Sequence, residues 1–169
     1  MSKIFFVTIL FILLNSCGSD KSRETNLKIQ VNVMEKLSNN LFYDKSGIYD
    51  SVRIEMSNKT DTVFRFWSLS CSWTYNWISN NEKIYLYPCD CYANFPITHE
   101  IKPGEKISFS GIIHVLDTLK SFNEYELKLG CIIVKEKEVI QDSDFLKILD
   151  YKISEKKDII WSEPFKINE

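Results

Sequence analysis

The chain has 169 residues and a formal net charge of −2, and it is 44% hydrophobic and 14% aromatic. This apolar content is typical of a folded chain with a core, and the length fits one domain. Lysine and glutamate are interspersed, without a basic cluster. The composition therefore excludes a disordered protein, and we expect no nucleic-acid partner.

The first sixteen residues have the layout of a secretory signal peptide. Lys3 supplies a positive charge, residues 4–14 are an apolar run, and Ser16 is a small residue directly before Cys17. A helix of that run reaches about 16 Å, too short for a hydrocarbon core of about 30 Å. The pattern predicts a lipoprotein signal over residues 1–16, with Cys17 as the lipidated first residue of the mature chain. The alternative is an ordinary cleaved signal followed by an incidental cysteine.

Residues 17–26 are polar and cannot bury enough apolar surface to fold, so we expect a flexible tether there. The folded domain is then expected over residues 27–169. Membrane attachment through the lipid on Cys17 predicts a place in the bacterial cell envelope. We expect the outer membrane, with the periplasmic and surface faces both left open.

Period-two alternation of apolar and polar residues recurs along the domain, and it is typical of strands with one buried face. Ser143 precedes an apolar cluster at helical spacing, which predicts a short helix over residues 143–149 before the last strand. The fold class expected is an all-β, Ig-like antiparallel sandwich of about seven strands. The strands are predicted at residues 27–33, 51–56, 63–67, 84–87, 107–115, 125–133 and 159–167.

Besides Cys17, four cysteines remain, and an exported protein favours disulfides between them. A bond between Cys89 and Cys91 is the poorest choice, because side chains two apart in an extended chain point the same way from Cα atoms about 6.6 Å apart. Two pairings stay open: Cys71–Cys89 with Cys91–Cys131, or Cys71–Cys91 with Cys89–Cys131. A metal site at residues 89–91 is the alternative, but the paired C-x₂-C spacing of thiolate sites is missing, and we expect no metal and no cofactor.

From Trp67 to Trp77 every odd residue is large or sulfur-bearing and every even residue is Ser, Thr or Asn. An extended chain would present one aromatic face there. That face is either part of the core or a surface for ligands, since aromatic rings can stack on sugars or peptide side chains. The candidates for this ligand surface are Trp73, Tyr75, Trp77, Tyr85, Tyr87 and Tyr92.

Catalytic motifs are missing from the sequence: there is no G-x-S-x-G, no H-E-x-x-H and no phosphate-binding glycine loop. His114 lies inside an apolar strand, so we expect a structural role for it. His99 is expected in a surface loop. We therefore expect no enzyme; an enzyme with an unrecognised site is the minority alternative.

Three segments together resemble a group of uncharacterised small lipoproteins of Bacteroidetes-type bacteria: residues 68–73, residues 93–96 and residues 101–105. The resemblance covers residues 48–135. It implies a signal, a lipid cysteine and an Ig-like sandwich, without an assigned activity. The doubled cysteine at residues 89 and 91 departs from the single cysteine expected. Such bacteria also O-glycosylate Asp-Ser/Thr-apolar sequences, which makes Thr62 and Thr118 candidate sites.

The function expected from these observations is a non-catalytic binding or interaction module, anchored to the envelope membrane by its lipid. Its partner is expected to be an envelope protein. The alternative is carbohydrate or small-ligand binding through the aromatic residues between positions 67 and 92.

Overall fold

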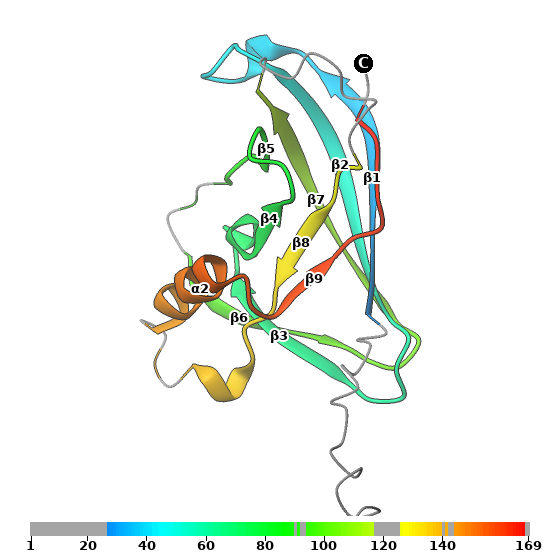
Figure 1. Cartoon of the computed structure of the whole chain (residues 1–169), viewed down its shortest axis with the longest axis vertical. Helices are drawn as coiled ribbons and strands as arrows, with labels where there is room; N and C mark the ends of the chain where they lie inside the picture. The colour runs from blue at the N-terminus through cyan, green and yellow to red at the C-terminus, as the bar shows by residue number, and fades with distance from the viewer. Residues whose placement is uncertain are drawn as a thin grey trace, which may run out of the picture.

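The computed structural model describes residues 27–89, 91, 94–116, 126–139, 141 and 144–167 (Figure 1). Within these residues the chain forms antiparallel strands, three short 3-10 helices and one α-helix. The strands are β1 (Leu27–Leu37), β2 (Ile48–Asn58), β3 (Phe64–Leu69), β4 (Trp77–Ser79), β5 (Ile84–Leu86), β6 (Pro96–Ile101), β7 (Lys106–Val115), β8 (Leu129–Ile132) and β9 (Ile159–Trp161). The helices are η1 (Asn39–Leu41), η2 (Trp73–Asn76), η4 (Glu136–Glu138) and α2 (Asp144–Glu155).

The strands form one large sheet and two small ones. The large sheet has the order β1-β2-β7-β5, and the small sheets are β3-β6 and β4-β8-β9. Main-chain hydrogen bonds join the sheets: Trp67 N–H of β3 donates to Val134 O, just after β8, at 2.8 Å, and Glu163 N–H, just after β9, donates to Ile29 O of β1 at 2.9 Å. The predicted all-β sandwich of antiparallel strands is confirmed.

The core lies between the large sheet and the small sheets. Alternation places Ile29 of β1, Ile54 of β2 and Ile113 of β7 on the inner face, where each is at most 1% exposed. Phe66 of β3 and Leu129 of β8 meet them from the opposite layer. Burying each such side chain stabilises the fold by about 1.5–3 kcal/mol, so the alternation read in the sequence is what selects this packing.

The predicted helix before the last strand is present as α2, and it is longer than expected. Phe145 and Leu149 pack against Leu69 of β3 and Ile132 of β8 in a second, smaller core. This core lies on the face of the small sheets that is turned away from the large sheet. The helix therefore adds a third layer, at the left of Figure 1.

A buried lysine ties α2 to the segments on either side of it. Lys152 is 4% exposed, and its ammonium donates to Ile133 O at 2.7 Å, to Glu138 Oε2 at 2.7 Å and to Asp158 Oδ2 at 2.8 Å. All three ammonium hydrogens thus have acceptors. The hydrogen bond from Lys152 lowers the pKa of Asp158. Burial raises the pKa of Glu138, but hydrogen bonds from Lys152 and the Lys135 N–H outweigh burial, and the net pKa is lowered.

We expect Lys152→Met to lower the free energy of unfolding at pH 7 by about 1–3 kcal/mol, because Ile133 O and both carboxylates lose their donor. A carboxyl whose pKa is lowered on folding stabilises the fold above its unfolded-state pKa, about 4, and this stabilisation is lost as the pH falls through the folded-state value. Wild type should therefore lose more stability than the variant between pH 7 and pH 3 in urea titrations.

Lys147→Met is the control for this prediction, because the Lys147 side chain is 80% exposed on the same helix. It should leave the unfolding midpoint nearly unchanged. Equal pH dependence of wild type and Lys152→Met would contradict the role assigned to the lysine.

Candidate functional site

The aromatic run does not stay extended. Strand β3 ends at Leu69, and the chain turns into η2 before β4 begins at Trp77. Asn76 holds this turn, because its side-chain amide donates to Trp67 O at 2.8 Å and to Ile132 O at 3.2 Å. The alternation of large and polar residues therefore does not produce a continuous aromatic face.

The rings predicted to form a ligand surface are split between two faces of the large sheet. On the inner face, Trp73 and Trp77 meet Phe109 at centroid distances of 5.0 and 6.1 Å. Trp77 is only 7% exposed, so its assignment to a ligand surface is wrong: it belongs to the core. Trp73 is half-buried and remains at the surface of that core.

On the outer face, Tyr85 and Tyr87 gather around His114, which is fully buried, at centroid distances of 5.0 and 6.4 Å. His114 Nε2 lies 3.0 Å from Ser46 O, a carbonyl that can only accept, so Nε2 carries the proton. Nδ1 is then the acceptor for the Tyr85 hydroxyl. Both nitrogens have partners, and the structural role expected for His114 agrees with this arrangement. Tyr75 is 45% exposed on η2, and Tyr92 lies outside the described residues.

A groove of about 350 Å³ opens between η2 and the edge of β7, and we call it the Trp73 groove. Trp73 can lie against β7 because Gly111 has no side chain: a Cβ there would come within 3.1 Å of the indole ring. Thr74 is 5% exposed, and its hydroxyl has no hydrogen-bond partner among the described residues. The groove is lined by Trp73, Thr74, Tyr87, Pro88, Cys89, Ser110, Gly111 and Ile112.

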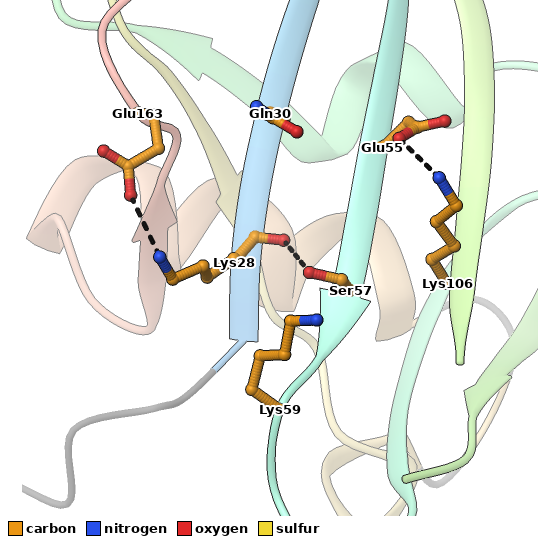
Figure 2. Close-up of a pocket in the computed structure, with 7 residues that line it drawn as sticks. All are labelled: Lys28, Gln30, Glu55, Ser57, Lys59, Lys106 and Glu163. Atoms are coloured by element: carbon orange, nitrogen blue, oxygen red, sulfur yellow. Dashed lines mark hydrogen bonds and ion pairs between the residues drawn. The ribbon is translucent and has the colours of Figure 1, made fainter. Parts of the chain in front are cut away.

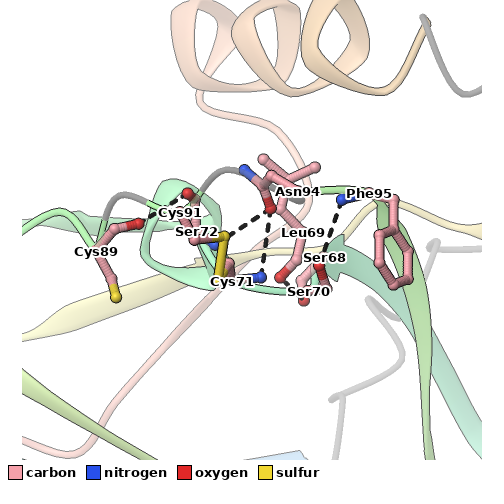
Figure 3. Close-up of a disulfide and its surroundings, with 9 residues drawn as sticks. All are labelled: Ser68, Leu69, Ser70, Cys71, Ser72, Cys89, Cys91, Asn94 and Phe95. Carbon is pink, nitrogen blue, oxygen red and sulfur yellow. Dashed lines mark hydrogen bonds between the residues drawn. A yellow bond between two sulfur atoms is a disulfide. The ribbon is translucent and has the colours of Figure 1, made fainter.

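A disulfide joins Cys71 to Cys91 beside the Trp73 groove, and Figure 3 shows its surroundings. The Asn94 side chain accepts from the main-chain N–H groups of Cys71 and Ser72 at 3.3 Å each, and the Ser72 hydroxyl donates to Cys89 O at 2.9 Å. The Ser72–Cys89 bond joins the residue just before η2 to the groove wall at Cys89. One of the two open pairings thus contains the observed disulfide.

The second disulfide of that pairing, Cys89–Cys131, does not form. Cys131 is fully buried in β8, where burial raises the pKa of its thiol, whereas Cys89 is an exposed free thiol at the rim of the groove. The sequence could not show this, because β8 turns Cys131 into the core. The pairing Cys71–Cys89 with Cys91–Cys131 is excluded as well.

The prediction that His99 lies in a surface loop is wrong. His99 lies in β6, where its Nε2 is 2.7 Å from the Ser68 hydroxyl. A serine hydroxyl beside a histidine is the start of a nucleophile–base pair. Ser68, however, is only 1% exposed and also donates to Leu69 O at 3.2 Å, and burial lowers the pKa of His99. No substrate can reach this hydroxyl in the fold described, so we assign the pair a structural role.

A second hollow, of about 530 Å³, lies on the outer face of β1, β2 and β7 (Figure 2). Its charges are largely paired: Lys106 lies 3.0 Å from Glu55, and Lys28 lies 4.0 Å from Glu163. Every residue that lines it is polar or charged. This hollow has the character of a solvated sheet face, and it is the weaker candidate.

The remaining candidates are distributed as follows. Thr62 is exposed in the turn between β2 and β3, whereas Thr118 and Cys17 lie outside the described residues. Among the residues that the structure describes, no group of His, Cys, Asp and Glu could hold a metal ion. In the same part of the chain, no helix is long and apolar enough to cross a bilayer.

No protein-family model matches the chain, and no curated protein matches its sequence. Among solved structures, the crystal structure of FixG-related protein from Vibrio parahaemolyticus is similar, with a TM-score of 0.38 and 12% identity. The match covers 85% of this chain and 98% of that chain. A similarity at this level supports no inference about fold or function.

Thiol labelling tests this arrangement of the four cysteines directly. In the native protein, maleimide should modify Cys89 and spare Cys131, which should react only after denaturation; Cys71 and Cys91 should react only after reduction. Peptide mapping by mass spectrometry under non-reducing conditions should find a Cys71–Cys91 linkage. Native labelling of Cys131, or a Cys89–Cys131 peptide, would contradict the structure.

Proposed function

We propose that this protein is a lipid-anchored, non-catalytic binding module of the bacterial cell envelope, which holds a partner protein in the Trp73 groove. The observation that carries the proposal is the groove itself: an apolar hollow bordered by Trp73, with Cys89 and Ser110 as polar residues in its lining. Binding sites commonly combine apolar walls with a few polar groups that set orientation.

The anchor part of the proposal rests on the sequence before β1. The signal-like residues 1–16, Cys17 and the polar tether lead directly to Leu27, where β1 begins. A coil of that length spans about 15–18 Å on average, so the partner should be at the membrane surface. The resemblance to small Bacteroidetes-type lipoproteins and the candidate glycosylation at Thr62 and Thr118 belong to the same proposal.

The anchor has a direct test. A Cys17→Ala chain, expressed in a bacterium that processes lipoproteins, should leave the membrane fraction and appear as soluble protein, because the acyl chains would be missing. Wild type should stay with the membranes after a salt wash. Cys89→Ala is the control, and it should fractionate as wild type. Membrane retention of Cys17→Ala would contradict the proposed anchor.

The groove can be tested in intact envelopes with a photo-crosslinking amino acid in place of Cys89. It should capture one protein, whereas the same amino acid in place of the exposed Lys147 on α2 should not. Trp73→Ala should reduce capture at position 89 at least about tenfold, as expected for a central aromatic contact. Thermal unfolding of Trp73→Ala should be measured alongside, because the ring also contacts Phe109.

Two outcomes would contradict this proposal. Equal capture at positions 89 and 147 would show that the groove selects nothing. Capture of a glycan instead of a protein would support the alternative function, carbohydrate binding through exposed rings such as Tyr75 and Tyr85.

A further inference from the structure

Strand β5 covers only one end of the edge of β7 that faces away from β2. Strand β5 pairs with β7 only from Ile84 opposite Val115 to Leu86 opposite Ile113, whereas β7 begins at Lys106. The last main-chain bond of this ladder runs from the Tyr87 N–H to Ile112 O, at 2.7 Å. Beyond Tyr87 the chain leaves β7, and the next residue that could bond it, Cys89, accepts at its carbonyl from the Ser72 hydroxyl at 2.9 Å.

The main-chain N–H and C=O groups of successive residues in β7 point alternately toward β2 and toward β5. Ile112 O and the Leu116 N–H bond on the β5 side, whereas Glu105 O accepts from Asn58 on the β2 side. Because the direction alternates along a strand, even-numbered residues face the β5 side. The N–H and C=O groups of Ser108 and Ser110 therefore point to the open edge.

No described residue pairs with this edge below Ile112. Strand β7 has β2 and β5 as its hydrogen-bonded neighbours, and both Ser108 and Ser110 are exposed. Proteins usually protect such edges with lysine, proline or bulges. Here two serines occupy the edge, and the nearest lysine, Lys106, is paired with Glu55 at 3.0 Å. The edge is left open next to the Trp73 groove, which Ser110 also lines.

We propose that a partner's extended segment adds to β7 as a new strand along Ser108 and Ser110, antiparallel to β7 and continuing the line of β5. This proposal rests on the proposed function and names the chemistry of the partner: a polypeptide backbone. Only a backbone offers donors and acceptors in the alternating pattern that this edge requires. The main-chain groups give affinity, and the groove gives specificity.

The pleat of β7 also predicts which partner side chains face the groove. Directly opposed residues of antiparallel strands have their side chains on the same face. The Trp73 ring packs on the same face of β7 as Phe109, with the two ring centroids 5.0 Å apart. A partner residue opposite Phe109 would have its side chain on this face. Partner residues opposite Ser108 and Ser110 lie on the exposed face. The segment should therefore be apolar at alternate positions only.

The test uses the full chain in intact envelopes, with the photo-crosslinking amino acid placed at Ser108 or at Ser110. Both sites should capture the protein that is captured from position 89. Mass spectrometry of the crosslinked peptides should place the residue captured from position 110 two residues before the one captured from position 108, because the strands are antiparallel. Captured residues without this offset, or in the opposite order, would overturn antiparallel strand addition.

Matched variants separate the backbone from the side chain. Ser110→Pro removes the edge N–H and should lower capture from position 89 roughly tenfold, whereas Ser110→Ala keeps the N–H and should lose far less capture than Ser110→Pro. No described group bonds to that N–H, so the proline should leave the fold intact, which thermal unfolding checks; Ser108→Pro is the second variant.

Three outcomes distinguish the proposals. Undiminished capture by folded Ser110→Pro and Ser108→Pro would overturn strand addition and leave the groove function standing. If the crosslinker at position 89 captures no protein in the otherwise unchanged chain, both strand addition and the groove function are overturned. Crosslinks that join position 110 of one copy to β7 of a second copy would overturn the partner segment in favour of a symmetric pairing of this chain.

Discussion

The contact between Trp73 and Gly111 is the constraint on which the candidate site depends. Without a side chain at Gly111, the indole ring lies against β7 and fixes η2 over the margin of the large sheet. A Cβ at this position would lie 3.1 Å from the ring, so the ring would have to shift by a few tenths of an ångström to make room for it. The contact thus uses a glycine in a strand interior, which costs β-propensity, to create a close approach that shapes the groove.

Two further features keep this margin open once η2 is fixed. The β5–β7 ladder ends at Tyr87, and the Cys71–Cys91 disulfide with the Ser72–Cys89 hydrogen bond holds the departing chain close to η2. The chain therefore cannot swing back onto β7 without disturbing η2. An open strand edge is a hazard in a free protein, but it is a recognition element when a partner segment is available to pair with it.

Most strands and the short helix could be predicted because alternation and capping are local signals, and the structure confirms the antiparallel sandwich; β4 and β6 were not predicted. Only part of the candidate site could be predicted from the sequence. Trp73 and Tyr87 were identified as aromatic residues, but the run was interpreted as one face, whereas the Asn76 hydrogen bonds fold it back. Those bonds join residues distant in sequence and leave no periodic signal. Gly111, inside an alternating strand, was the available signal for a close approach.

The cysteines show the same limit for a different reason. Spacing made a bond between Cys89 and Cys91 the poorest choice, but both remaining pairings used Cys131, and spacing does not show that β8 turns this residue into the core. Once that thiol is in the core, Cys71 and Cys91 pair and Cys89 stays free at the groove rim. The core takes Cys131, and the disulfide and the Cys89 thiol lie at the surface beside the groove that borders the unpaired edge of β7.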